Sequence, residues 1–183
     1  MALATGVLSG LLRGATAPVP SLSLGAVSPV PVVAVIALVP AIAVTWGWSG
    51  LGWEATAAAA RSTWLLVAPL LVTNLAAFAL GSWLVGGSGS LLESGRNACG
   101  LLGLALLGCL ALGERGAVAV PTGYLLAAFL LGRGSGRSEP WWWAWVLSDG
   151  GSVVAGGSAI ALLLGGVLVL PRIPVAVLRR GER

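Results

Sequence analysis

The stretch STWLLVAPLLVTNLAAFALGSWLV, residues 62–85, decides the fold class of this chain. It contains no charged side chain. Its length meets the roughly 20 apolar residues that an α-helix needs to cross a lipid bilayer. Residues 62–85 are therefore predicted to form a membrane-spanning helix.

The composition of the whole chain agrees with this prediction. Of the 183 residues, 57% are hydrophobic and only 9% are charged, and the mean hydropathy is +0.98. Soluble domains carry about 25% charged residues. A soluble protein of this size could therefore not cover its surface with so few charged side chains. The net charge of +4 comes from arginine alone, because the chain has no lysine. This bias and the richness in Ala, Gly, Leu and Val suggest a GC-rich bacterial genome, and hence a bacterial inner membrane protein.

Further apolar segments lie on both sides of the first one. We expect an all-α integral membrane protein, a polytopic helix bundle of five spans in a lipid bilayer. The other four predicted spans are residues 31–49, 98–113, 117–132 and 152–170. The GERG turn between 98–113 and 117–132 predicts a helical hairpin, and Pro40 predicts a kink in the first span.

The ends of the chain differ from this predicted bundle. Residues 1–30 are too interrupted by proline to span a bilayer, and they are predicted to form an interfacial or cytoplasmic arm. Residues 31–170 would form the bundle, and residues 171–183 a basic C-terminal tail. The arginines are scattered singly, with no basic stripe, so nucleic-acid binding is not expected.

Four tryptophans crowd the sequence SEPWWWAWVLSDGG: Trp141, Trp142, Trp143 and Trp145. Three interpretations are open. The rings form an interfacial anchor at headgroup depth, or the segment is a short re-entrant element inside the protein. The third interpretation is an aromatic cage for a cationic ligand, for which Glu139 and Asp149 are the nearby acidic residues.

The placement of arginine predicts the topology. With five plain spans, the ten arginines divide six to four between the two sides. If residues 140–170 instead enter and leave on the same side, only Arg61 and Arg115 lie outside. The positive-inside rule favours this second arrangement, with a cytoplasmic C-terminus.

Residues that carry chemistry are scarce. The chain has no histidine, which removes histidine-based metal sites and the usual haem ligands. Cys99 and Cys109 lie about 15 Å apart along a helix, too far for a disulfide. No predicted span contains a charged residue, and no nucleophile or phosphate-binding motif occurs. The protein is therefore not expected to be an enzyme, and no catalytic, cofactor or metal site is predicted.

Small residues at helical spacing predict close helix packing. Thr73, Ala77 and Gly81 form one such series, and Gly157, Ala161 and Gly165 form another. Each series makes a face along which a neighbouring helix, within this chain or from another subunit, can approach closely.

Residues 61–96 carry a family resemblance, and residues 123–133 extend it. The features are Arg61 and Ser62, Pro69 and Leu70, Ala76 to Phe78, Gly81, and the LLESGR turn at 91–96. This pattern resembles the permeases of small bacterial ABC-type transporters of the exporter class. The resemblance implies a transmembrane subunit that works with a separate ATPase subunit and a second permease chain. It also implies that Leu91, Leu92, Glu93 and Arg96 contact the ATPase.

A second hypothesis accounts for the same features without transport. Uncharged spans and small-residue faces suit passive packing equally well. The chain would then be a non-catalytic structural or accessory subunit of a larger membrane protein complex.

Overall fold

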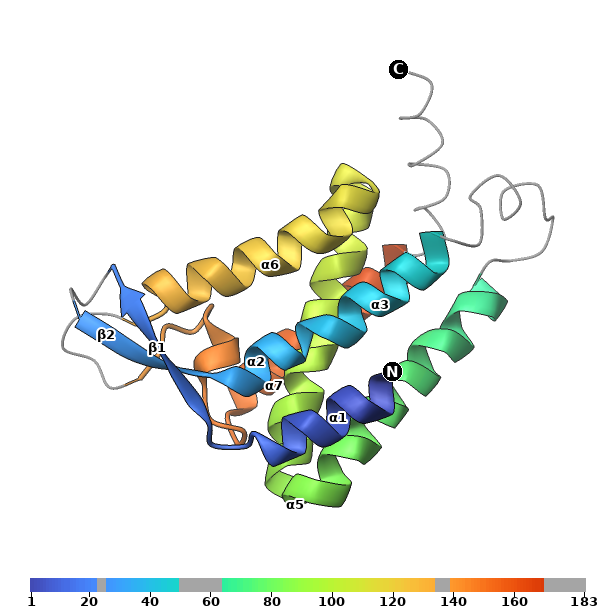
Figure 1. The fold of residues 1–183 in the computed structure, drawn as a ribbon. Helices are drawn as coiled ribbons and strands as arrows, with labels where there is room; N and C mark the ends of the chain where they lie inside the picture. Colours follow the sequence, from blue (N-terminus) through green and yellow to red (C-terminus); the bar gives the residue numbers. More distant parts are fainter. Residues whose placement is uncertain (23–25, 50–63, 134–138, 170–183) are drawn as a thin grey trace.

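The computed structural model describes residues 1–22, 26–49, 64–133 and 139–169, and it is mostly helical. In chain order the elements are α1 (Ala2–Leu11), β1 (Thr16–Ser21), β2 (Ala26–Pro31), α2 (Val32–Ile36), α3 (Leu38–Ser49), α5 (Trp64–Leu112), α6 (Glu114–Leu131), the 3-10 turn η1 (Trp145–Leu147) and α7 (Val153–Val169). The helical fold class predicted from the sequence is thus confirmed, with the addition of a small β-hairpin (Figure 1).

The longest helix, α5, is broken near its middle. At Gly87 the backbone adopts φ 69° and ψ −166°, which is a conformation essentially restricted to glycine. The chain reverses there, so that α5 consists of two segments that form a hairpin (Figure 1). The LLESGR turn expected at 91–96 is therefore helical, because helix continues on both sides of Gly87.

Five membrane spans are not supported by this structure. Among the helices that the structure describes, only α5 is both long and apolar enough to cross a bilayer, with a mean hydropathy of 1.6 in its most apolar stretch. Helices α1 and α7 have 10 and 17 residues. Helix α6 begins with Glu114 and Arg115, which lower its hydropathy.

The first predicted span is divided into two short helices. Helix α2 ends at Ile36 and α3 begins at Leu38, two residues before the predicted kink at Pro40. Proline lacks the N–H that would bond to the carbonyl of Ile36, and its ring collides with that carbonyl. The first span is therefore interrupted because of Pro40, as predicted, but the interruption lies about one helical turn before the proline.

The expected N-terminal arm consists of α1 and the β-hairpin. Pro18 of the hairpin pairs with Pro29, while Pro20 pairs with Val27 and Pro31 pairs with Thr16, so all four prolines lie at alternate pairs of the register. The N–H of Val32 donates to Ala15, so the hydrogen-bonded pairs are the positions between these prolines. The prolines thus occupy positions that need no donor. This hairpin is a correction to the all-α prediction.

The second segment of α5 lies at the centre of the molecule. The predicted hairpin with α6 is present, and Gly108 and Gly116 allow the two backbones to cross closely. Helix α7 packs on the same segment, with Gly166 against Gly103 and Leu106. Because the loop before α7 lies near Arg96, α7 runs in the same direction as this segment (Figure 1).

Candidate functional site

The main polar feature of the interior is Arg96, on the second segment of α5. Its side chain is only 7% exposed. Nη1 donates to the carbonyl of Asp149 at 2.7 Å, Nη2 donates to the carbonyl of Ser148 at 2.8 Å, and Nε donates to Oδ1 of Asn97 at 3.2 Å. A buried guanidinium is tolerated only when its donors are satisfied. Arg96 therefore holds the 148–149 loop, and the start of α7, against α5.

Asn97 lies next to Arg96 and is fully buried. Its Oδ1 accepts from Arg96, while its Nδ2 has no hydrogen-bond partner among the residues that the structure describes. A buried amide donor without an acceptor costs free energy.

Two pairs of buried serines lie near the bend of α5. Ser82 and Ser90 share a hydrogen bond of 2.7 Å across the bend, and so connect the two segments. Ser9 and Ser94 share another of 2.7 Å and connect α1 to the second segment. The bend is thus closed by hydroxyl groups that satisfy one another.

The tryptophan segment is divided between the interior and the surface. Trp145 is 3% exposed and stacks on Tyr124, with ring centroids 5.2 Å apart and an interplanar angle of 18°. A methyl group on Gly100 would overlap its ring. The interpretation of Trp145 as an interfacial anchor is therefore wrong, because Gly100 opens a slot on α5 that the indole fills.

The other three tryptophans are more accessible. Trp141 and Trp142 are exposed, and Trp143 is half-buried. The carbonyl of Trp143 accepts a hydrogen bond of 3.0 Å from the Tyr124 hydroxyl. The helical part of this segment is limited to η1. An anchoring role for Trp141, Trp142 and Trp143 stays a prediction.

The four residues predicted to contact an ATPase do not form one surface. They lie in the first turns after Gly87, where Leu92 is 58% exposed and Leu91 and Glu93 are half-buried. Arg96 points inward to the 148–149 loop. Only the Leu91–Glu93 portion is placed to meet another protein.

The first predicted packing series has one member in close contact. Gly81 lies against the backbone of α1 at Leu3 and Val7. Thr73 is exposed and donates to the carbonyl of Pro69 at 2.7 Å, and Ala77 is half-buried. The sequence reasoning missed that α1 supplies the partner face, although Gly6 and Gly10 carry the same four-residue spacing.

The second series is open in this structure. Gly157 and Gly165 have no neighbouring atom close enough to contact an added methyl group, and Ala161 is exposed. The side of α7 that packs on α5 is formed instead by Ala155, Ala159 and Gly166.

A cavity of about 650 Å³ lies next to the Arg96 loop. It is formed by the 139–142 segment, the 147–152 loop and the first turn of α7. Its polar and aromatic lining consists of Arg133, Glu139, Trp142, Ser148, Asp149 and Ser152. The structure thus brings one aromatic ring, Trp142, together with the carboxylates of Glu139 and Asp149 around this cavity.

Nothing in the described ranges brings three or more Cys, Asp or Glu side chains together to hold a metal ion. The chain matches no protein-family profile, no curated protein and no solved structure.

The residues missed by the sequence analysis are the serines, Asn97, Tyr124 and the carbonyls of the 148–149 loop. One signal was available: Ser82, Gly86, Ser90 and Ser94 recur every four residues, which is typical of a small polar helix face. The carbonyls have no such signal, because any residue could supply them.

Proposed function

We propose that this chain is an integral membrane protein that serves as a non-catalytic subunit of a larger membrane complex. The observation that carries the proposal is the outward-facing apolar surface of α5. Only 22% of its most apolar stretch is buried, whereas the core helix of a soluble protein is mostly buried. Its first segment, from Trp64 to Gly86, contains no charged residue.

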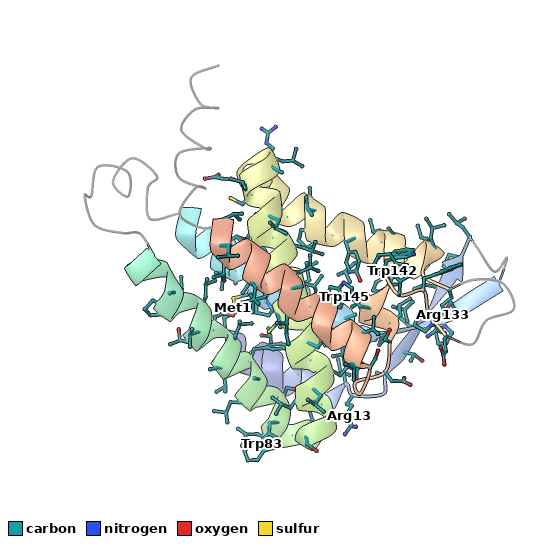
Figure 2. All side chains as sticks on the ribbon, turned by 180° about the vertical axis from the view of Figure 1, so that it is seen from behind. Met1, Arg13, Trp83, Arg133, Trp142 and Trp145 are labelled. Atoms are coloured by element: carbon teal, nitrogen blue, oxygen red, sulfur yellow. The ribbon has the colours of Figure 1, made fainter. Side chains whose placement is uncertain are left out.

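Individual side chains on this segment support lipid contact. Val72 is 65% exposed and Leu84 is 62% exposed, and the side chains of Leu70 and Leu80 are also exposed. Trp83 is exposed as well, and it projects outward from the first segment of α5 (Figure 2). Exposed apolar surface of this extent marks a membrane or protein contact. Helix α7 continues it with the exposed side chains of Ile160, Leu164 and Leu168.

The direction of α7 supports a topology. Because α7 runs with the second segment of α5, we place its C-terminal end on the side of Arg115. This replaces the arrangement in which residues 140–170 enter and leave on one side. Six of the ten arginines then belong to the same side of the membrane as Arg115. By the positive-inside rule this side is the cytoplasmic one, and the C-terminus is cytoplasmic too.

The open series on α7 supports a partner helix. Gly157, Ala161 and Gly165 would let the backbone of a neighbouring membrane helix approach closely.

The experiment is purification of the tagged chain in mild detergent, with mass spectrometry of the co-purifying proteins. We expect a membrane assembly without a P-loop ATPase. Replacing Gly157 and Gly165 by Leu should release the partner.

Gly156→Leu is the matched control. Gly156 also has open space beside it, but it points to another side of α7. If the partner stays bound to the Gly157/Gly165 variant, or if the chain is extracted from membranes by carbonate, the proposal is overturned.

An exporter permease subunit is the second candidate. The exposed side chain of Leu92, at the end of the α5 hairpin, is the observation that favours it, together with the resemblance over 61–96. This candidate requires the Gly87 bend to face the cytoplasm. Leu92→Ser combined with Glu93→Gln should then abolish transport while the chain still assembles in the membrane. Arg96 is left intact in this test, since its loss would disturb the fold.

A further inference from the structure

We propose that the cavity beside Trp142 binds a zwitterion that carries an ammonium group and a phosphate group, such as a phosphoethanolamine headgroup. The inference goes beyond the proposed function, because a structural subunit needs no ligand. Its basis is a cavity whose lining holds both signs of charge and an exposed aromatic ring.

The ammonium group would lie against Trp142. This side chain is 72% exposed although it lines the cavity, so its ring face is accessible. An indole ring attracts an ammonium group through its quadrupole. Glu139 and Asp149 line the same cavity and add two carboxylates.

The phosphate group would lie near Arg133 and the first turn of α7. Arg133 lines the cavity and lies at the same end of the molecule as Trp142 (Figure 2). Helix α7 begins at Val153, and the first N–H groups of a helix have no acceptor inside the helix. Ser152 caps this end by accepting from the N–H of Ala155 at 3.4 Å.

The cavity is lined by side chains of both positive and negative charge. Arg133 attracts an anionic group, and Glu139 and Asp149 attract a cationic group, so the lining complements both ends of a zwitterion. A volume of about 650 Å³ lies within the usual range for small-molecule sites.

Arg96 prepares one wall of this cavity. Its two hydrogen bonds to the carbonyls of Ser148 and Asp149 fix the backbone from which the Asp149 side chain projects. A wall that is fixed before binding lowers the entropic cost of holding a ligand.

The experiment uses the full chain in two settings. Glycerophosphoethanolamine is titrated into the detergent-solubilised protein by calorimetry. The protein is also placed in nanodiscs that contain either phosphatidylethanolamine or phosphatidylglycerol, and bound lipid is counted by native mass spectrometry. We expect phosphatidylethanolamine to be retained in preference to phosphatidylglycerol. Binding of the soluble headgroup as well would show that free zwitterions also fit the cavity.

Single substitutions assign the binding to this cavity. Trp142→Ala should weaken binding about two- to fivefold, the size of an exposed cation–π contact, and Glu139→Gln and Asp149→Asn should each weaken it. Trp141→Ala is the matched control, because Trp141 is the adjacent exposed tryptophan and is not part of the lining. Equal effects of Trp141→Ala and Trp142→Ala, or no preference for the ammonium-bearing probe, would overturn the proposal.

The two proposals can fail separately. Loss of the ligand preference leaves carbonate-resistant membrane insertion and partner binding unchanged. Loss of membrane insertion, by contrast, would leave binding of the soluble headgroup to be measured on its own.

Discussion

At the scale of single residues, two glycines set the path of the chain. Gly87 has φ 69° and ψ −166°, and Gly113, between α5 and α6, has φ 73° and ψ −159°. Both lie in a region that side chains with a Cβ avoid. Each reversal of the helical chain thus depends on one residue without a side chain.

Gly87→Ala should lower the free energy of unfolding by about 1–3 kcal/mol, because the backbone conformation at this position would be strained. Gly95→Ala is the control, since both glycines have open space beside them and only Gly87 has a positive φ. We expect Gly95→Ala to stabilise the helix by up to about 1 kcal/mol. Thermal unfolding in detergent measures both, and an equal effect of the two variants would contradict this account.

Arg96→Ala should cost about 2–3 kcal/mol, because the carbonyls of Ser148 and Asp149 lose a charged donor. Arg13→Ala removes one exposed hydrogen bond, of 2.9 Å to the carbonyl of Gly86, and should cost less than about 1 kcal/mol. Chemical unfolding of the two variants side by side tests this order; the reverse order would mean that Arg96 does not hold the loop.

Many contacts of single residues could not be predicted from the sequence. Arg96 was expected to contact an ATPase, because the LLESGR turn at 91–96 resembles a turn of the exporter permeases. The structure shows helix continuing through it, with backbone carbonyls from residues 148 and 149 as its acceptors. Backbone acceptors some 50 residues away leave no pattern in the sequence.

At the scale of elements, close helix pairs are built on glycine. Gly6 lies against the backbone of Phe78, and Gly81 against the backbone of Leu3. The hairpin of α5 and α6 was predictable, because a polar turn between two apolar runs is a local signal. The β-hairpin was not predictable, since prolines usually argue against strands and are tolerated here only by their alternation.

Gly81→Leu should detach α1 from α5, because the added side chain would occupy the space of the α1 backbone. Faster proteolysis after Arg13 is the expected result. Gly157→Leu should leave this cleavage unchanged, because Gly157 faces open space. If both variants are cleaved equally fast, general instability and not the α1 contact explains the result.

At the scale of the whole molecule, the helical fold class was predicted correctly from the sequence, whereas the predicted number of spans is not supported. The exposed apolar faces of α5 and α7 agree with an integral membrane protein. Span counting from apolar runs was unreliable, because Pro40 divides one run and because Glu114 and Arg115 belong to a helix and not to a turn.

Cysteine labelling tests the topology, with Cys99 and Cys109 replaced by alanine. In intact cells, an impermeant thiol reagent should label Ser88→Cys at the α5 bend and should not label Gly181→Cys in the C-terminal tail. The physical reason is that α7 runs alongside the second segment of α5. Labelling of Gly181→Cys alone would reverse the orientation and favour the permease candidate.

For the membrane protein proposed above, the serine pair at the bend of α5 also bears on how the chain would enter a bilayer. Ser82 and Ser90 face each other only when the two segments are already side by side. In a lone segment each serine could bond only to its own helix backbone, as Ser158 does to Val154, whereas the closed hairpin pairs the two hydroxyls and buries them. The bend therefore favours insertion of the two segments as one folded unit, with the polar groups that would oppose entry neutralised before they leave water.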